Sequence, residues 1–334
     1  MISQKLIAEK AGVSFATVSR ALTHSAKVRP ETLKRIRDAM LELGITNTDD
    51  LFLGKSVLSK LVLVVVGDIC TEFFASIIVG LSDVLTANGY SIALCNSHYD
   101  AGYEISSIQS AQDNGYAGIV MITAVETNEL VTFLQHAHIP IVLVNRYIRS
   151  LDMDVVRIDN YRGGYLAAQY LIENGHRRIA HLAGPKNSSA VEDRLRGFRH
   201  AMLDSGLSFS DSDLVFGDLS RECGKQFARH LADGDYTAAY IGNDCMTAGT
   251  MHQLIKLGLS VPDDVSLISF DDSPLINEDG LNVTCIGYDS RTMGNYAAET
   301  LLKRIEDPLG RRIKTICSPT LTKRASVRCF VNVK

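Results

Sequence analysis

The sequence predicts an α/β protein with two parts: a small N-terminal head of three helices that contains a helix-turn-helix, and a larger body of two lobes. Each lobe is expected to hold a parallel sheet with helices on both faces. Three observations predict this fold. Apolar residues recur at helical spacing in the first 45 residues, short apolar runs alternate with helical segments from residue 61 onward, and this alternation restarts near Tyr161.

The head divides into three short helices at recognisable signals. Gly12 interrupts the first pair of helices, Ser14 is placed to cap a second helix over residues 15–22, and Pro30 suits the first turn of the third. The apolar residues that set the helical spacing are Leu6, Ile7, Ala11, Val18, Ala21, Leu22, Leu33, Ile36 and Met40. Two helices joined by a tight turn that contains glycine are typical of a helix-turn-helix.

The body contains eight apolar runs of strand length, separated by segments with helical periodicity. Such an alternation predicts βαβ units and parallel strands whose faces are both covered. The runs occupy residues 61–67, 90–95, 118–123, 140–145, 155–159, 178–184, 238–243 and 265–270.

Two lobes imply a cleft between them, and the ends of the predicted strands are polar. Ligands of open α/β sheets bind beyond the carboxyl ends of the strands. The polar residues at these ends are Asp68, Asn145, Asp159, Asn243, Asp244, Asp271 and Asp272. The cleft is therefore the expected ligand site.

Charge is distributed unevenly along the chain, whose formal net charge is −4. Residues 1–60 hold ten basic and six acidic side chains, whereas the rest of the chain holds 24 basic and 32 acidic ones. A basic head on an acidic body indicates that the head binds a polyanion.

Several classes of function are disfavoured. No apolar run approaches the roughly 18 residues of a membrane span, and the first residues lack the apolar stretch of a signal peptide, so we expect a cytoplasmic protein. The seven cysteines are scattered without metal-type spacing and are expected to be reduced. No nucleotide-binding glycine motif occurs, so no cofactor is expected.

Two residue groups invite an enzymatic or metal-binding interpretation, and we reject both. His176 precedes a predicted strand with no serine or cysteine nucleophile placed to use it. The pair Asp271 and Asp272 is a candidate metal site, but hard cations need several converging carboxylates. We expect neither catalysis nor a bound metal.

The segment GVSFATVSRAL at residues 12–22 resembles the helix-turn-helix of the LacI/GalR family of bacterial transcriptional repressors, especially the galactose-type members. Further segments resemble the family in the same order along almost the whole chain. They are VVVGDICTEFFASIIVGL, NGYSIALCN, IPIVLVNR, IDNYRGGYLAAQYLIENGHRRIAHLAGP, RLRGFRHAM, GNDCMTAGTM, GLSVPDDVSLISFDDSPL and CSPTLTKRASV. The resemblance implies a DNA-binding head on a body like the periplasmic binding proteins.

The resemblance implies a set of DNA-contacting residues in the head. Phe15, Ala16 and Arg20 are expected to reach base edges in the major groove, because Arg pairs with guanine and apolar groups contact the thymine methyl. The residues expected near phosphates are Ser14, Thr17, Ser19 and His24. The alternatives are a solvated surface charge for Arg20 and packing inside the head for Phe15.

The resemblance also implies a small-molecule effector in the cleft. Arg194, Asn243 and Asp271 are expected to contact it, and their chemistry suits the hydroxyls of a sugar. The further candidates are Asp68, Phe73, Phe74, Asn145, Arg146, Leu219 and Tyr288. Either Phe73 or Phe74 is alternatively a core residue, and Leu219 replaces the aromatic residue that relatives often have.

The segment between head and body departs from the family. Relatives carry a Pro-Asn pair and an arginine in a short helix that enters the minor groove, whereas residues 44–60 read GITNTDDLFLGKSVLSK. Leu51 or Leu53 is the expected wedge between bases, and two neighbouring carboxylates, Asp49 and Asp50, oppose docking onto phosphates. We place the head at residues 1–45, this hinge at 46–60 and the body at 61–334. The N-terminal lobe is expected over about 61–160 plus 291–320, and the C-terminal lobe over about 161–290 plus 321–334.

The functional hypothesis is a homodimeric repressor that binds a near-palindromic operator in double-stranded DNA and is controlled by the effector. The chain ends without a leucine-heptad tail, so dimers rather than tetramers are expected. A neutral sugar is the favoured effector, and a purine or nucleoside is the alternative. A solute-binding protein without DNA function and an enzyme are the remaining alternatives.

Overall fold

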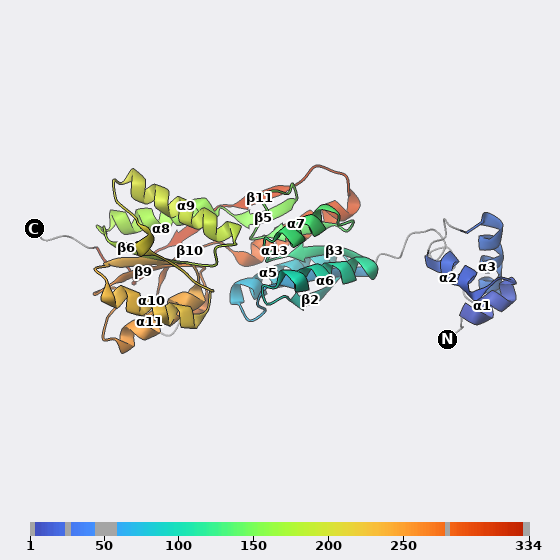
Figure 1. The fold of residues 1–334 in the computed structure, drawn as a ribbon, viewed down its shortest axis with the longest axis horizontal. Helices are drawn as coiled ribbons and strands as arrows, with labels where there is room; N and C mark the ends of the chain where they lie inside the picture. Colours follow the sequence, from blue (N-terminus) through green and yellow to red (C-terminus); the bar gives the residue numbers. More distant parts are fainter. Residues whose placement is uncertain (1–3, 24–27, 44–58, 278–280, 330–334) are drawn as a thin grey trace, which may run out of the picture.

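The computed structural model describes residues 4–23, 28–43, 59–277 and 281–329. The predicted contact residue His24 and the hinge candidates Leu51 and Leu53 lie outside this range, as do Asp49 and Asp50. Within it, the structure confirms a three-helix head and a two-lobed α/β body (Figure 1).

The head consists of helices α1 (Gln4–Ala11), α2 (Phe15–Thr23) and α3 (Pro30–Glu42), as the sequence predicts. The fully buried side chains of Val18 and Ala21 pack against those of Ile36 and Met40, which builds a small core of its own. Gly12 adopts φ +61° in the turn after α1, a conformation that favours glycine. The three helices therefore form a compact helix-turn-helix unit.

The N-terminal lobe is built on a six-stranded sheet in the order β11-β5-β4-β3-β1-β2, and all its strand pairs are parallel. The strands are β1 (Ser59–Val66), β2 (Ser91–Asn96), β3 (Tyr116–Met121), β4 (Ile141–Val144), β5 (Asp154–Ile158) and β11 (Lys314–Cys317). The helices of this lobe are α5 (Glu72–Ala87), α6 (Ala101–Asp113), α7 (Asn128–Gln135) and α13 (Ser290–Glu306).

The C-terminal lobe repeats this plan with the strand order β12-β10-β9-β8-β6-β7, in which the β10–β12 pair is antiparallel and the other described pairs are parallel. Its strands are β6 (Ile179–Ala183), β7 (Leu214–Phe216), β8 (Ala238–Ile241), β9 (Ser266–Phe270), β10 (Thr284–Gly287) and β12 (Thr320–Thr322). Its helices are α8 (Asn160–Glu173), α9 (Ser189–Asp204), α10 (Arg221–Asp233), α11 (Asp244–Lys256) and α12 (Pro274–Asn277), with a short 3₁₀ turn η2 (Asp211–Asp213).

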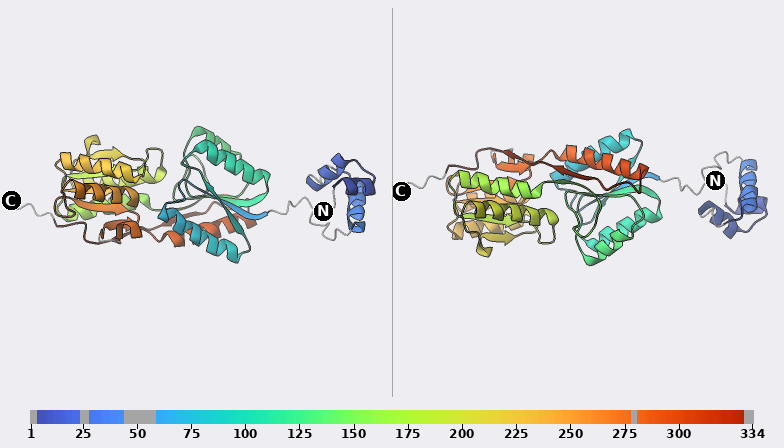
Figure 2. Two further views of the ribbon diagram at one scale, coloured as in Figure 1. Left: turned by 90° about the horizontal axis from the view of Figure 1, so that it is seen from below. Right: turned by 90° about the horizontal axis from the view of Figure 1, so that it is seen from above.

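The apolar runs of the sequence are buried on both faces, which explains why they do not alternate with polar residues. Along β1, Val62 and Val64 face a core that includes residues of α5 and α13, whereas Leu63 and Val65 face a second core on the side of α6 and α7. Figure 2 shows helices on both sides of the N-terminal sheet. The chain passes between the lobes after β5, after β10 and after β11.

Three pairs of helices cross with almost no space between their backbones. A Cβ atom added at Gly164 of α8 would lie 2.0 Å from the carbonyl oxygen of Arg194 in α9, and one at Gly197 of α9 would lie 1.9 Å from that of Tyr161. Reciprocal glycines also occur in α5 with α13 (Gly80 and Gly294) and in α10 with α11 (Gly224 and Gly249). Glycine at these crossings fixes where α9, and so Arg194, lies relative to the sheet.

Candidate functional site

The surface of α2 carries the residues that the sequence predicts to read DNA. Phe15 is 56% exposed, and Ala16 and Arg20 are also exposed, while Val18 and Ala21 on the opposite side of the helix are buried. Phe15 therefore lies on the surface rather than in the core of the head. Ser19 also lies in α2.

The beginning of α2 is fixed by Ser14, as predicted. The Ser14 hydroxyl oxygen accepts a hydrogen bond of 3.1 Å from the backbone N–H of Thr17, and the two hydroxyl groups are 2.8 Å apart. Arg35 of α3 donates hydrogen bonds of 2.7 and 3.0 Å to the carbonyl groups of Ala11 and Gly12. This contact holds the turn that sets α2 against α1.

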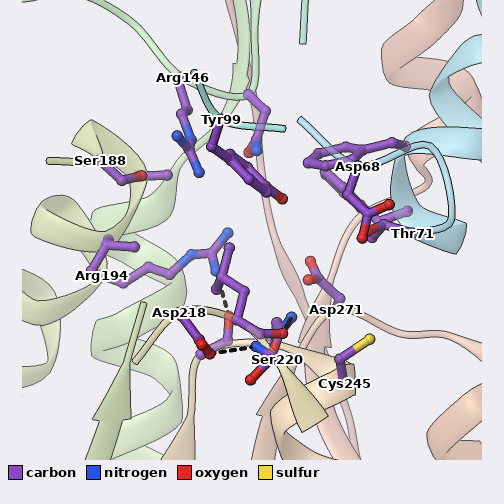
Figure 3. A pocket seen from close by; sticks show the side chains of 18 of the residues that line it. Asp68, Thr71, Tyr99, Arg146, Ser188, Arg194, Asp218, Ser220, Cys245 and Asp271 are labelled. Atoms are coloured by element: carbon purple, nitrogen blue, oxygen red, sulfur yellow. Dashed lines mark hydrogen bonds between the residues drawn. The ribbon is translucent and has the colours of Figure 1, made fainter. Parts of the chain in front are cut away.

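A cavity of about 280 Å³ lies between the lobes, at the carboxyl ends of strands from both sheets (Figure 3). Nine of the ten predicted effector residues line it: Asp68, Phe73, Phe74, Asn145, Arg146, Arg194, Leu219, Asn243 and Asp271. Residues that are far apart in the sequence therefore meet in one place, because each follows a strand or begins the next helix.

Tyr288 is the predicted effector residue that lies outside this lining set. Tyr288 follows β10 directly, but its ring packs against the central apolar core and its hydroxyl group is hydrogen-bonded to Cys317. It is not among the residues that line the cavity. The chain crosses to the other lobe at this point, which turns the side chain away from the cleft.

The cavity has further lining residues that the sequence does not predict. These are Thr71, Tyr99, Ser188, Ala190, Val191, Asp218, Ser220, Arg221, Gly242 and Cys245. Asp218, Ser220 and Arg221 follow β7, a three-residue strand that the sequence analysis did not find. Tyr99 and Ser188 follow strands that were predicted, so the rule that ligands bind at strand ends would have located them.

The two phenylalanines that begin α5 differ in environment. Phe74 is only 5% exposed and belongs to the core, whereas Phe73 is partly buried at its edge. Their ring centroids are 5.6 Å apart. Phe73 is therefore more exposed than Phe74, although both line the cavity.

The backbone is strained around the cavity. Tyr99, Asn145, Leu219 and Asp271 have φ values between 59° and 71°, in the left-handed region. Asn and Asp tolerate this region, but Tyr and Leu adopt it rarely, at a cost of roughly 1–3 kcal/mol. Such residues cluster at functional sites, where the surrounding structure holds them in place.

Arg194 and Asp271 form the charged centre of the cavity. Arg194 donates from Nε to the side-chain oxygen of Asn160 and from Nη1 to the carbonyl of Gly242, both at 2.8 Å, and its guanidinium carbon lies 3.3 Å from the ring centroid of Phe270. Burial raises the pKa of the Asp271 carboxyl to about 7, although the charge of Arg194 acts in the opposite direction. The protonation of Asp271 therefore changes near neutral pH.

Asn243 has a structural role in addition to its place in the cavity wall. Its side-chain oxygen accepts a hydrogen bond of 2.9 Å from the backbone N–H of Met246, which caps α11, and its amide donates one of 3.1 Å to the carbonyl of Leu219. Asn243 therefore positions the loop that carries Leu219.

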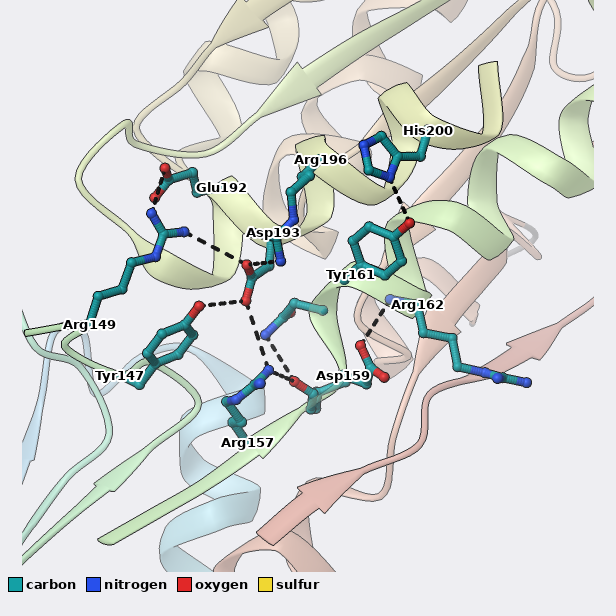
Figure 4. A network of polar contacts seen from close by, with 12 residues as sticks. Tyr147, Arg149, Arg157, Asp159, Tyr161, Arg162, Glu192, Asp193, Arg196 and His200 are labelled. Atoms are coloured by element: carbon teal, nitrogen blue, oxygen red, sulfur yellow. Dashed lines mark hydrogen bonds and ion pairs between the residues drawn. The ribbon is translucent and has the colours of Figure 1, made fainter. Parts of the chain in front are cut away.

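A polar network beside the cavity joins the lobes (Figure 4). Asp193 of α9 has a side chain that is only 2% exposed. It accepts hydrogen bonds from the Tyr147 hydroxyl at 3.0 Å and from Arg196 at 2.9 Å. Arg149 pairs with Glu192 at 2.8 Å and lies 3.8 Å from Asp193. Since Tyr147 and Arg149 follow β4, these contacts tie the N-terminal lobe to α9 of the C-terminal lobe.

Other kinds of site have no counterpart in the described part of the chain. No cluster of three or more His, Cys, Asp and Glu side chains is arranged there to hold a metal ion. No helix within the same residues is long and apolar enough to cross a membrane.

Comparison with known proteins identifies both parts of the chain. Residues 59–320 match the family described as periplasmic binding proteins and sugar binding domain of LacI family, and residues 5–46 match bacterial regulatory proteins, lacI family. The transcriptional regulator GalR of Escherichia coli is 30% identical over 98% of this chain and 96% of its own. The transcriptional regulator DegA of Bacillus subtilis is 26% identical over 96% of each.

Solved structures agree over most of the chain. The transcriptional regulator CelR in complex with cellobiose has a TM-score of 0.75 and 27% identity, covering 98% of this chain and 100% of its own. A LacI-family regulator from Enterococcus faecium with bound ribose has a TM-score of 0.73 and 26% identity over 81% of this chain and 100% of its own.

Proposed function

The chain belongs to the LacI family of bacterial regulatory proteins and is a ligand-responsive DNA-binding transcriptional repressor, and we propose that α2 reads the operator while a sugar in the interlobe cavity sets the affinity for DNA. The observation that carries this proposal is the cavity itself, because polar side chains from both lobes line it. A ligand that bridges the lobes stabilises one arrangement of them, and a change in that arrangement alters how the heads are presented.

The exposed face of α2 supports the DNA-reading part of the proposal. Arg20 donates a planar pair of N–H groups that matches the major-groove edge of guanine, and Phe15 and Ala16 offer apolar contact to thymine methyl groups. Ser14 and Thr17 at the start of the helix suit phosphate contacts. Side chains that read bases are thus presented beside hydroxyl groups suited to the DNA backbone.

A homodimer is the assembly that we propose for DNA binding. β2 is an edge strand of the N-terminal sheet, and the large side chains of Leu94 and Tyr103 beside this edge are 48% and 53% exposed. Two-fold symmetry of the protein would require a near-palindromic operator with two half-sites. Analytical ultracentrifugation of the wild type and of Leu94→Asp measures whether each protein is a dimer or a monomer. A monomeric wild type would contradict the proposal.

A sugar fits the cavity better than a purine or nucleoside. Carboxylates and amides such as Asp68, Asn145 and Asp271 pair with vicinal hydroxyls, and Phe73 provides one apolar face. Leu219 also lines the cavity, at a position where relatives often have an aromatic residue, and this removes one stacking partner for a planar base. Two structural relatives hold cellobiose and ribose. Calorimetry against hexoses, galactosides and nucleosides tests the choice, and binding of the nucleosides alone would overturn it.

Selection of random DNA duplexes by the full-length protein tests the proposal as a whole. We expect enrichment of a near-palindromic sequence whose affinity changes when the effector is added. A solute-binding protein without DNA function would enrich none, and the match of residues 5–46 to a regulatory family argues against that alternative.

A further inference from the structure

Arg146 is a buried cation for which the described residues provide no polar partner. It follows β4, is only 5% exposed and lines the interlobe cavity. Among the described residues, its guanidinium makes no hydrogen bond or ion pair, and it lies over the ring of Tyr99, whose centroid is 5.6 Å away. Burying a charge is unfavourable unless it is paired and hydrogen-bonded, so a partner from outside the chain is expected.

The amino end of α9 opens on the same part of the cavity. Ser188, Ala190 and Val191 line the cavity there. The Ser188 side chain lies at the N-cap position but forms no capping bond, and its buried hydroxyl has no hydrogen-bond partner in the described part of the chain. By contrast, α8, α10 and α11 of the same lobe are each capped by a side chain. The first N–H groups of a helix have no acceptor within it and attract anions.

A second arginine completes this end of the cavity. Arg194 is held by its Nε and Nη1 atoms, which leaves Nη2 without a hydrogen bond to any residue that the structure describes. In Figure 3, Arg146, Ser188 and Arg194 lie on one side of the cavity, while Asp68, Thr71 and Asp271 lie on the other. Asp218 lies below Arg194 in Figure 3, where its carboxylate accepts a hydrogen bond from the backbone N–H of Ser220. Above it, the side of Arg146 and Arg194 is cationic, and the opposite side is rich in oxygen acceptors.

Glu104 does not form a hydrogen bond or an ion pair with Arg146. Its carboxylate accepts hydrogen bonds from the backbone N–H of Val125 at 3.1 Å and from the Ser97 hydroxyl at 3.4 Å. Burial raises the pKa of Glu104 to about 7, so near neutral pH it carries less than a full negative charge. The positive charge of Arg146 is available to a ligand.

We propose that the effector is a polyhydroxylated oxyanion, either a sugar acid or a sugar phosphate. Its anionic group binds Arg146, Ser188 and the amino end of α9, with Nη2 of Arg194 beside it, and its hydroxyls face Asp68 and Asp271. Arginine and helix N–H groups form strong, directional hydrogen bonds with carboxylate and phosphate oxygens. This inference rests on the proposed role of the cavity as the effector site, and it replaces the neutral sugar that the sequence resemblance favours.

The test uses the full-length protein, thermal shift and calorimetry at constant ionic strength set with chloride. The probes are inorganic phosphate, D-galacturonate, D-galactose 6-phosphate and D-galactose. We expect phosphate to raise the melting temperature, and at least one anionic sugar to bind about 10-fold or more tightly than galactose. Tighter binding of the uronate indicates a carboxylate effector, and tighter binding of the 6-phosphate indicates a phosphate.

Three variants test whether the anion binds at Arg146 and Ser188. Arg146→Gln is expected to weaken binding of the anionic sugar by about 10- to 100-fold and to abolish stabilisation by phosphate. Ser188→Ala, a smaller change, should weaken binding of the anion by about 3- to 10-fold. Arg162→Gln removes an exposed arginine of α8 and should change neither measurement.

Three outcomes would overturn the proposal: no stabilisation by phosphate, equal or tighter binding of galactose, or stabilisation by phosphate that persists in Arg146→Gln. The last would place the anion elsewhere, such as on the head. None of these outcomes depends on DNA. If no DNA duplex is enriched, the repressor function is contradicted but the anionic effector is not. If galactose binds as tightly as the anionic sugars, the anionic effector is contradicted but the repressor function is not.

Discussion

The Tyr147 hydroxyl, in the N-terminal lobe, donates a hydrogen bond of 3.0 Å to the carboxylate of Asp193, in α9 of the C-terminal lobe. Asp193 is almost fully buried. Its carboxylate also forms an ion pair with Arg196 and lies near Arg149 and Arg157. Removing a partner from a buried charge costs more than removing an exposed ion pair. This contact therefore stabilises the arrangement of the lobes around the cavity.

Tyr147→Phe should shift the lobes toward a more open arrangement. The variant deletes only the hydroxyl group and should cost about 1.5–3 kcal/mol of interlobe stability, because the bond is to a carboxylate. We expect a larger radius of gyration in small-angle X-ray scattering and weaker binding of the effector. The matched control is Tyr165→Phe, which deletes an equally long bond to Asp204 within the C-terminal lobe. Equal scattering changes in both variants would contradict the prediction.

Arg20→Ala and Thr17→Ala should affect DNA binding in different ways. Loss of the Arg20 side chain should relax the preference at one base pair in each half-site, by about 1–3 kcal/mol, since a base contact carries sequence information. Loss of the Thr17 hydroxyl should weaken binding to all sequences alike, because a phosphate contact carries none. Titration against the selected operator and its single-base variants measures both. Indistinguishable patterns would refute the assignment.

Asp271→Asn should change how stability depends on pH. The pKa of Asp271 in the folded protein is about 7, above that of an unfolded chain, so folding takes up a proton between about pH 4 and 7. The wild type therefore loses this contribution to stability as the pH rises through that range, and the Asn variant does not. The melting temperature of the variant relative to the wild type should rise by a few degrees from pH 5 to pH 8.

Comparison of the two proteins isolates Asp271, because Glu104, His176 and His181 titrate alike in both. Asn also tolerates the left-handed backbone at this position. Asp235→Asn, at an exposed loop position, serves as the control and should show no such trend. A constant difference between wild type and Asp271→Asn from pH 5 to 8 would show that Asp271 is ionised throughout.

Gly164→Ala should destabilise the protein by about 1–3 kcal/mol, because the added methyl group would lie 2.0 Å from the Arg194 carbonyl and force α8 and α9 apart. Arg194 moves with α9, so effector affinity should fall as well. Urea unfolding and calorimetry measure the two effects. Gly102→Ala in α6, where the nearest atom is a side-chain oxygen of Asp100 at 3.2 Å, should change stability by less than about 1 kcal/mol. Similar losses in the two variants would exclude tight packing as the cause.

Much of this molecule follows from the sequence by itself. Helical spacing, Gly12, Ser14 and Pro30 determine the three helices of the head, because these signals act over a few residues. The eight apolar runs predict eight strands, because a short run that is apolar without alternation fits a strand buried on both faces and helical segments separate the runs. The strand ends that carry Asp68, Asn145 and Asp271 determine where the cavity lies.

The tertiary structure decided the rest. Strands β7, β10, β11 and β12 read LVF, TCIG, KTIC and TLT, which are too short or too polar to mark a strand locally, and they form strands because neighbouring strands pair with them. The turn of Tyr288 toward the core and the capping role of Asn243 depend on side-chain directions that no local pattern encodes. The burial of Arg146 without a polar partner among the described residues, and the contact of Tyr147 with Asp193, depend on residues brought together from distant parts of the chain, so only the assembled lobes reveal them.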